Sequence, residues 1–145
     1  MSDQLELGLE HRVNPVILIA EDNDPCYTVL SSLLSRKIPK IYSPQIMQAK
    51  DGESALQTLR SRKDITHLFL DMQLPQIMGY EVAVIIRNGI MPHYTKLPII
   101  AVTANAMPHD RELCIAAGCN DYISKPIAVK ELQRVIDVYF QRKIG

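Results

Sequence analysis

The stretch His67-Leu68-Phe69-Leu70-Asp71-Met72-Gln73-Leu74-Pro75 decides the fold of this chain. Its apolar run stops at the carboxylate of Asp71, and the chain then turns at Pro75. A short apolar run bounded by turn signals is typical of a buried β-strand. We therefore predict a central strand over residues 65–70, with Asp71 at the point where the chain leaves the core.

Three other apolar runs end in the same way, at polar residues. They cover residues 16–20, 97–102 and 121–124, and the polar residues that follow them are Glu21 with Asp22, Thr103 and Lys125. In an open parallel sheet the carboxyl ends of the strands lie at one edge, which is where ligands bind. We therefore expect three carboxylates, a hydroxyl and an ammonium group to meet at this edge.

Helix signals separate these runs along the chain. The expected helices begin at Asp24-Pro25, Asp51-Gly52, Tyr80, Pro108 and Val129, and one more strand covers residues 45–49. Asp24 is predicted to be an N-cap. Five strands that alternate with five helices predict an α/β fold built on a doubly wound parallel sheet. We interpret residues 1–14 as an N-terminal tail or linker and residues 15–143 as one domain.

The composition narrows the class of protein. The 145 residues are 47% hydrophobic and 22% charged, which is typical of a globular domain. Lysine plus arginine equals aspartate plus glutamate, at 16 each, which argues against nucleic-acid binding or membrane contact by this domain. Three cysteines without a Cys-x-x-Cys motif indicate free thiols, and the polar start lacks a signal-peptide core. We expect a soluble, cytoplasmic protein.

The polar residues at the strand ends suggest phosphoryl chemistry. Three carboxylates at close range repel one another, so ionising all of them needs a counter-ion. Mg2+ provides one, because it prefers hard oxygen ligands and shares them with phosphate. One carboxylate could then attack a phosphoryl group and form an acyl phosphate. Lys125 would balance the transferred charge, and the Thr103 hydroxyl could donate a hydrogen bond to a phosphoryl oxygen.

At this point the residues match a known family. The order Glu21-Asp22, then Asp71 with Pro75 and Gly79, then Thr103-Ala104, then Lys125-Pro126 resembles the response regulator receiver domain of two-component and phosphorelay systems. The resemblance runs from Pro15 to Phe140 and is strongest to receivers of hybrid sensor histidine kinases. It implies a flavodoxin-like fold, with a five-stranded sheet of order 2-1-3-4-5 flanked by five helices.

The resemblance also implies a phosphoacceptor and a metal site. Asp71 would take a phosphoryl group from phosphohistidine on a histidine kinase or a histidine phosphotransfer protein. Asp22 and Asp71 would bind Mg2+ directly, Glu21 mainly through water, and Gln73 through its backbone carbonyl. Enzymatic activity would be confined to self-phosphorylation from a phosphodonor and slow autodephosphorylation.

Further roles follow for the last two strands. Thr103 and Lys125 would contact the phosphoryl group, and Thr103 and Tyr122 would form a switch pair that changes conformation on phosphorylation. The Lys125-Pro126 bond is expected to be cis. The apolar run of residues 82–86 departs from the family, because the exposed face of that helix is usually more charged.

Other interpretations have to be weighed against this one. The acids could simply cap a helix, Asp71 could be a turn residue, and Tyr122 could be a packing residue. A dinucleotide-binding domain would need a glycine-rich turn where Glu21 and Asp22 stand. A phosphohydrolase of the haloacid dehalogenase type would need an aspartate at Gln73. The strongest alternative is a phosphorylation-independent pseudo-receiver that acts as a protein docking module.

Overall fold

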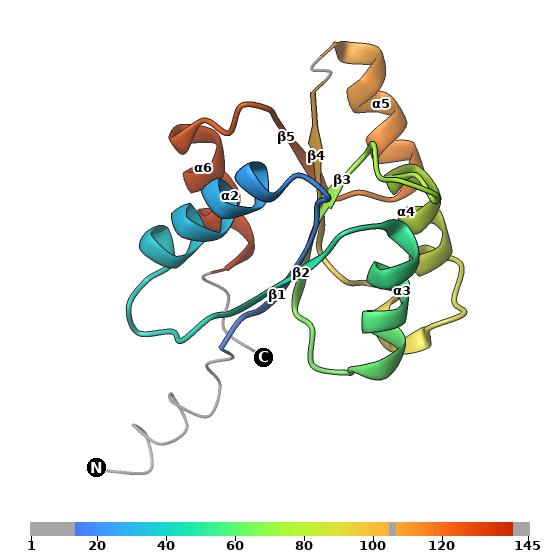
Figure 1. Ribbon diagram of the computed structural model, residues 1–145, viewed down its shortest axis with the longest axis horizontal. Helices are drawn as coiled ribbons and strands as arrows, with labels where there is room; N and C mark the ends of the chain where they lie inside the picture. The colour runs from blue at the N-terminus through green and yellow to red at the C-terminus, as the bar shows by residue number, and fades with distance from the viewer. Residues whose placement is uncertain (1–13, 105–106, 141–145) are drawn as a thin grey trace.

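The computed structural model describes residues 14–104 and 107–140, and Figure 1 shows a central sheet with helices on both faces. The five strands are β1 (Val16–Ala20), β2 (Gln45–Ala49), β3 (His67–Asp71), β4 (Ile99–Thr103) and β5 (Asp121–Ser124). They are all parallel and lie in the order β2-β1-β3-β4-β5. The predicted fold class and strand order are confirmed.

The described residues also form five α-helices and one short 3-10 helix. They are α2 (Asp24–Lys37), α3 (Gly52–Ser61), α4 (Gly79–Arg87), η1 (Pro92–Tyr94), α5 (Pro108–Ala117) and α6 (Val129–Tyr139). Helices α2 and α6 cover one face of the sheet, and α3, α4 and α5 cover the other (Figure 1). None of the helices in the described ranges is long and apolar enough to cross a membrane.

The central strand β3 is buried along its whole length. Side chains of a strand alternate between the two faces of the sheet. Leu68 and Leu70 therefore pack into the core under α3, α4 and α5, whereas Phe69 packs into the core under α2 and α6. Burial on both faces explains why the sequence of β3 is a continuous apolar run rather than an alternating one.

Two predicted boundaries of the strands are wrong by about two residues. β3 covers residues 67–71 rather than 65–70, because the N–H of Ile65 donates to the Tyr94 hydroxyl (3.2 Å) instead of joining the sheet. β4 covers residues 99–103 rather than 97–102, since Pro98 has no N–H to donate. As a consequence, Asp71 is the last residue of its strand rather than the first residue after it.

The predicted cap of the first helix is also displaced by one residue. Asn23, not Asp24, is the N-cap of α2, and its side-chain oxygen accepts the N–H of Cys26 at 2.9 Å. Asp24 is the first helical residue, and its carboxylate forms an exposed ion pair with Lys50.

Helix α4 begins directly against the end of β3. The N–H of Gly79 donates to the carbonyl of Met72 at 3.1 Å, and a Cβ atom at Gly79 would lie 2.7 Å from the Cα of Met72. Only glycine permits this approach. The apolar run that follows is mostly core, since Val82 and Ile86 are fully buried, although Val84 remains about half exposed (51%). The predicted tail, residues 1–14, lies outside the described residues except for residue 14, and so do residues 141–143 of the predicted domain.

Candidate functional site

Three carboxylates meet at the carboxyl ends of β1 and β3. These strands are neighbours, and Ala20 lies beside Leu70, so the residues after them converge. One oxygen atom each of Glu21, Asp22 and Asp71 lies within 4.8 Å of the others. Glu21 and Asp71 are buried, whereas Asp22 is exposed. The predicted cluster of acids is therefore present, and it is open to solvent on the side of Asp22.

Two hydrogen bonds orient the carboxylate of Asp71. Its Oδ1 atom accepts the backbone N–H of Gln73 at 3.0 Å, and its Oδ2 atom accepts from the Nζ atom of Lys125 at 3.2 Å. Asp71 is 5% exposed, so few conformations are open to its side chain. Gln73 thus lies next to the cluster as predicted, although the role of its carbonyl group in metal binding stays a prediction.

Glu21 is held on both of its oxygens. Oε1 lies 2.8 Å from the ammonium of Lys125, and Oε2 accepts the backbone N–H of Asn23 at 3.1 Å. Burial raises the pKa of the Glu21 carboxyl above its ordinary value, the hydrogen bond from Lys125 works against that rise, and the charge of Asp71 adds to it. A nearby cation would therefore stabilise the charged form of Glu21.

Lys125 completes the cluster from the end of β5. Its backbone N–H donates to the carbonyl of Thr103 at 2.8 Å, and the peptide bond to Pro126 is cis, as predicted. Burial lowers the pKa of the ammonium, but the hydrogen bond to Glu21 and the charge of Asp71 outweigh it, so the pKa is raised overall. Lys125 therefore remains charged beside the acids.

The predicted switch residues lie on one face of the sheet. In parallel strands, residues that are in register point to the same face, as do residues two apart. Thr103 is in register with Ser124, and Ala101 with Tyr122, so the side chains of Thr103 and Tyr122 share the face that packs on α5. Thr103 is 1% exposed at the end of β4, and the Tyr122 ring is half-buried.

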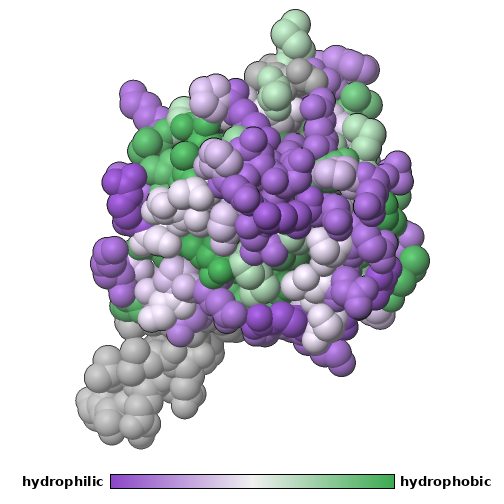
Figure 2. Space-filling model, viewed as in Figure 1, coloured by the Kyte–Doolittle hydropathy of each residue, from purple (hydrophilic) through white to green (hydrophobic). Residues whose placement is uncertain are grey.

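The cluster has the donor set of a magnesium site. Three carboxylates and one ammonium leave a formal charge of −2, and hard oxygen atoms gathered around one point are the ligands that Mg2+ prefers. Glu21, Asp22 and Asp71 could therefore hold such an ion. Hydrophilic side chains gather over this edge of the sheet, with a hydrophobic area beside them toward α2 and α6 (Figure 2).

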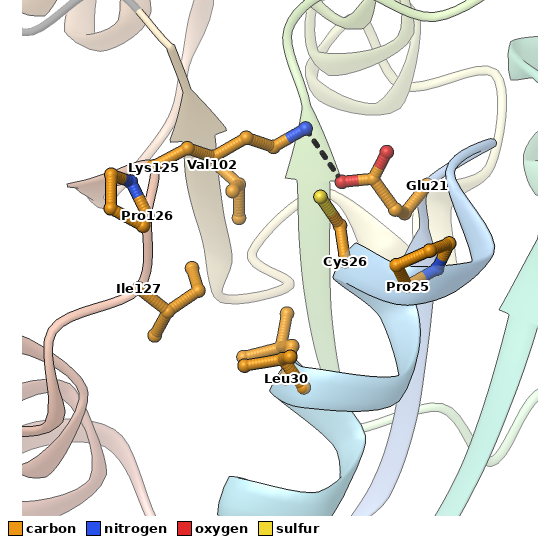
Figure 3. Close-up of a pocket in the computed structure, with 9 residues that line it drawn as sticks. Glu21, Pro25, Cys26, Leu30, Val102, Lys125, Pro126 and Ile127 are labelled. Carbon is orange, nitrogen blue, oxygen red and sulfur yellow. Dashed lines mark ion pairs between the residues drawn. The ribbon is translucent and has the colours of Figure 1, made fainter.

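An apolar pocket of about 180 Å3 adjoins the carboxylates. Its walls come from α2, β4 and the segments that follow β1 and β5, and they consist of Glu21, Pro25, Cys26, Val29, Leu30, Val102, Lys125, Pro126 and Ile127. Figure 3 shows Lys125 reaching over this pocket to Glu21, with the Cys26 sulfur directed toward the ion pair. The walls of the pocket lie far apart along the chain, so no local pattern in the sequence indicates it.

Sequence reasoning also missed two residues that support the site. Asn23 donates its N–H to Glu21 while its side chain caps α2, so one residue fixes both the acid and the helix. Arg111 of α5 places its guanidinium 5.1 Å from the centre of the Tyr122 ring. An acid-Asn pair before a helix could have indicated the first, whereas nothing in the sequence indicates the second.

Comparisons with known proteins all indicate the same protein family. Residues 17–137 match the model of the response regulator receiver domain family. The chain is 33% identical over 140 residues to Hybrid signal transduction histidine kinase I of Dictyostelium discoideum, a match that covers 94% of this chain and 8% of that protein. The chain thus spans less than a tenth of the length of this relative.

Solved structures agree with the sequence match. The structure is similar to the receiver domain of sensor histidine kinase PA1611 from Pseudomonas aeruginosa PAO1, which has a magnesium ion coordinated in its active-site cleft. The TM-score is 0.75 at 32% identity, with 90% of this chain and 100% of that chain covered. A second similar structure is the receiver domain of Ssk1 from Saccharomyces cerevisiae, crystallised with the histidine phosphotransfer protein Ypd1. There the TM-score is 0.75 at 26% identity, and 88% and 90% of the two chains are covered.

Proposed function

The chain belongs to the response regulator receiver domain family, and on that premise we propose that Asp71 accepts a phosphoryl group from phosphohistidine. The donor is a histidine kinase or a histidine phosphotransfer protein of a two-component or phosphorelay system. The observation that carries the proposal is the position of Asp71, at the end of the central strand between two further acids and Lys125.

The proposed reaction transfers the phosphoryl group from nitrogen to oxygen. An oxygen of the Asp71 carboxylate forms a bond to phosphorus while the bond between phosphorus and the donor's imidazole nitrogen breaks. The electron pair of that bond stays on the imidazole, which takes up a proton from solvent. The chain's own contribution is to orient Asp71 through the N–H of Gln73 and to offset charge through Lys125.

Magnesium is part of the proposal. When bound, Mg2+ supplies positive charge that neutralises the acids and the phosphoryl oxygens. Asp22 and Asp71 would bind it directly, Glu21 mainly through water, and Gln73 through its carbonyl oxygen. The raised pKa of Glu21 supports this assignment, because a cation beside that carboxylate relieves the penalty of burying its charge.

The output of the reaction is a change of conformation. Thr103 would donate its hydroxyl hydrogen to a phosphoryl oxygen, and the Tyr122 ring would then move, since both side chains lie on one face of the sheet. The changed surface of α5, β5 and α6 would be read by a downstream protein. The three cysteines are free, in keeping with the reducing cytoplasm in which we place the reaction.

The experiment is mass spectrometry of the intact protein after incubation with acetyl phosphate and magnesium chloride. We expect the mass of one added phosphoryl group on the wild type and none on Asp71→Asn, whereas Asp137→Asn, an exposed acid of α6, serves as the control and should be labelled normally. EDTA should abolish labelling of the wild type, Asp22→Ala should nearly abolish it, and Glu21→Ala should weaken it less.

Three results would count against the proposal. Equal labelling of Asp71→Asn would show that another residue accepts the phosphoryl group. Labelling that is insensitive to EDTA would show that the reaction does not need a metal ion. A wild-type protein that no donor labels, including a phosphorylated phosphotransfer protein, would favour the docking module that does not use phosphorylation.

A further inference from the structure

Arg111 and Tyr122 form a contact between α5 and β5 that the proposed reaction does not explain. The guanidinium carbon of Arg111 lies 5.1 Å from the centre of the Tyr122 ring, which is within the range of a cation–π interaction. The half-buried ring also packs against the core under α3, α4 and α5. The exposed Arg111 therefore contacts a ring that the core buries only in part.

Among the described residues, no carboxylate competes for the guanidinium of Arg111. Across residues 14–104 and 107–140, no acid lies within ion-pair distance of Arg111. Arg134 behaves differently, since it donates to both carboxylate oxygens of Asp121, at 2.8 and 3.0 Å. Within the described part of the chain, the exposed guanidinium of Arg111 is thus directed to the ring of Tyr122.

The backbone and the ring of Tyr122 are held from different sides. Arg134 of α6 binds the side chain of Asp121 and also approaches the carbonyl of Tyr122 at 3.5 Å, so α6 restrains the strand. Arg111 of α5 touches the ring. A movement of Tyr122 is therefore a rotation of its side chain on a fixed strand. Such a rotation breaks the contact between the ring and Arg111.

The surroundings leave room for this rotation. An open cavity of about 430 Å3 lies between α5 and α6, lined by Arg111, Ile115, Asn120, Asp121, Tyr122, Glu131 and Arg134. The ring position seen here accompanies the ion pair between Lys125 and Asp71, at 3.2 Å. A phosphoryl group on Asp71 would have to share or break that ion pair. The contact with Arg111 thus coexists with an intact ion pair between Lys125 and Asp71.

We propose that Arg111 is a positioning residue that holds the Tyr122 ring in its unphosphorylated position and so sets how readily the domain switches. The inference rests on the proposed function, because it assumes that Tyr122 responds to a phosphoryl group on Asp71. A ligand's apparent affinity rises with the fraction of protein already in the binding-competent state. Removing Arg111 should raise the fraction of protein in the binding-competent state. The strength of an exposed cation–π contact corresponds to about a two- to five-fold change in the dissociation constant of the ligand.

The test measures the dissociation constant of beryllium fluoride, a phosphoryl mimic, by NMR titration in excess magnesium. Arg111→Ala should bind about two- to five-fold more tightly than the wild type, and Arg111→Lys should lie between them, because an ammonium still attracts the ring. Glu112→Ala, at the next exposed position of α5, is the matched control and should bind like the wild type.

A second background separates positioning from a general effect on the helix. In Tyr122→Ala the ring is absent, so adding Arg111→Ala should leave the dissociation constant unchanged. An equal gain in both backgrounds, or no gain in the wild-type background, overturns the role of Arg111 while the proposed function stands. Failure of the wild type itself to bind beryllium fluoride overturns the proposed function and this inference with it.

Discussion

The Nζ atom of Lys125 lies 2.8 Å from Oε1 of Glu21, and this ion pair joins the ends of β5 and β1 across the edge of the sheet. The two strands are not neighbours, because β3 and β4 lie between them. The lysine side chain therefore passes over the end of β3, where its Nζ atom also lies 3.2 Å from Oδ2 of Asp71. One ammonium group thus serves two buried acids, and both lose their counter-ion if it is removed.

We expect Lys125→Met to destabilise the metal-free protein at neutral pH. The side chains of Glu21 and Asp71 are only 5% and 6% exposed, so their charges would be left without a partner. Lys125 itself is 22% exposed, so solvent reduces the effect to roughly 1–3 kcal/mol of the free energy of unfolding. Urea denaturation would measure it, with the exposed Lys130→Met as the control.

The same variant has a predictable pH dependence. Burial raises the pKa of Glu21 in the folded state. Between this raised pKa and the ordinary value of 4.5, the native state therefore binds more protons than the unfolded state. The contribution of Glu21 to stability should therefore rise as the pH falls through this raised pKa toward the ordinary value of 4.5, and it should rise more steeply in Lys125→Met. A midpoint of urea unfolding that matches the wild type at every pH would show that the ammonium is not needed.

Asp71→Asn should make the metal-free protein more stable, by about 1 kcal/mol, since it removes one of three repelling charges. Magnesium should raise the melting temperature of the wild type, because the ion binds the folded protein preferentially, and it should raise that of Asp71→Asn less. Differential scanning calorimetry with and without magnesium would measure both effects. A clear loss of stability in Asp71→Asn would instead make Asp71 a structural turn residue.

Local patterns in the sequence predicted the strands and the polar residues at their ends. A strand covered on both faces must be apolar throughout, so β1, β3 and β4 were visible as runs, and the acids and Lys125 were visible as the points where those runs stop. The grouping of these residues then followed from the rule that parallel strands end at one edge of a sheet, and the sheet order followed from the family resemblance. The structure agrees on each of these points.

The remaining features depend on contacts between distant segments. Ile65 stays out of β3 because its N–H donates to Tyr94, 29 residues away. Arg111 meets Tyr122 only because α5 packs beside β5, and no periodicity in either segment signals that contact. The cap at Asn23 was missed for a local reason, since Asn and Asp are comparable N-caps and the two stand next to each other.

We expect Arg87→Met to be strongly destabilising, although it is far from the acids. The guanidinium of Arg87 donates to the carbonyls of Gly118 and Thr95 and to the side chain of Asn120, at 2.9, 3.0 and 2.9 Å. The loss of these bonds should cost roughly 2–4 kcal/mol. Thermal unfolding would measure it against the exposed Arg36→Met.

Arg87→Lys should recover only part of that stability, because an ammonium cannot reach three acceptors in the geometry of a guanidinium. Full recovery would show that the charge of Arg87, rather than its hydrogen bonds, stabilises the ends of α4 and α5.

His67 should make the protein less stable in mild acid. Its Nε2 atom lies 2.8 Å from the carbonyl of Tyr139 and its Nδ1 atom 2.7 Å from the Thr66 hydroxyl, an arrangement that suits the neutral ring. The ring also stacks on Phe140 at 3.8 Å. Burial lowers the pKa of His67 from 6.5 to about 4, while the backbone hydrogen bond opposes this.

Between these two values the unfolded state binds the extra proton, so the contribution of neutral His67 is complete above pH 6.5 and is lost as the pH falls toward about 4. At pH 5 the loss should be about 2 kcal/mol. Urea unfolding from pH 7.5 to pH 5 should therefore show a smaller decline for His67→Gln than for the wild type. The exposed His109→Gln should decline like the wild type. Parallel curves for His67→Gln and the wild type would refute the assignment.

Thr103 connects Asp71 to the surface that we expect to change on phosphorylation. Thr103 is 1% exposed at the end of β4, and its backbone carbonyl accepts the N–H of Lys125, which places it beside the acid cluster. Its side chain lies on the face of the sheet that packs on α5. Thr103→Val keeps the volume of the side chain and removes the hydroxyl. Thr103→Ser keeps the hydroxyl and serves as the matched control.

Beryllium fluoride should perturb the amide NMR signals of wild-type β5 and α5 in addition to those around Asp71. Moving a two-state equilibrium from 1:99 to 99:1 takes about 5.5 kcal/mol, so a weaker hydrogen bond to the phosphoryl mimic should leave the switch incomplete. Thr103→Val should therefore keep Asp71 labelling and the nearby signals but shrink the distant ones, while Thr103→Ser should preserve both. If the wild-type changes stop at the loop after Asp71, phosphorylation does not reach the Tyr122 surface, and the domain signals through another face or by docking alone.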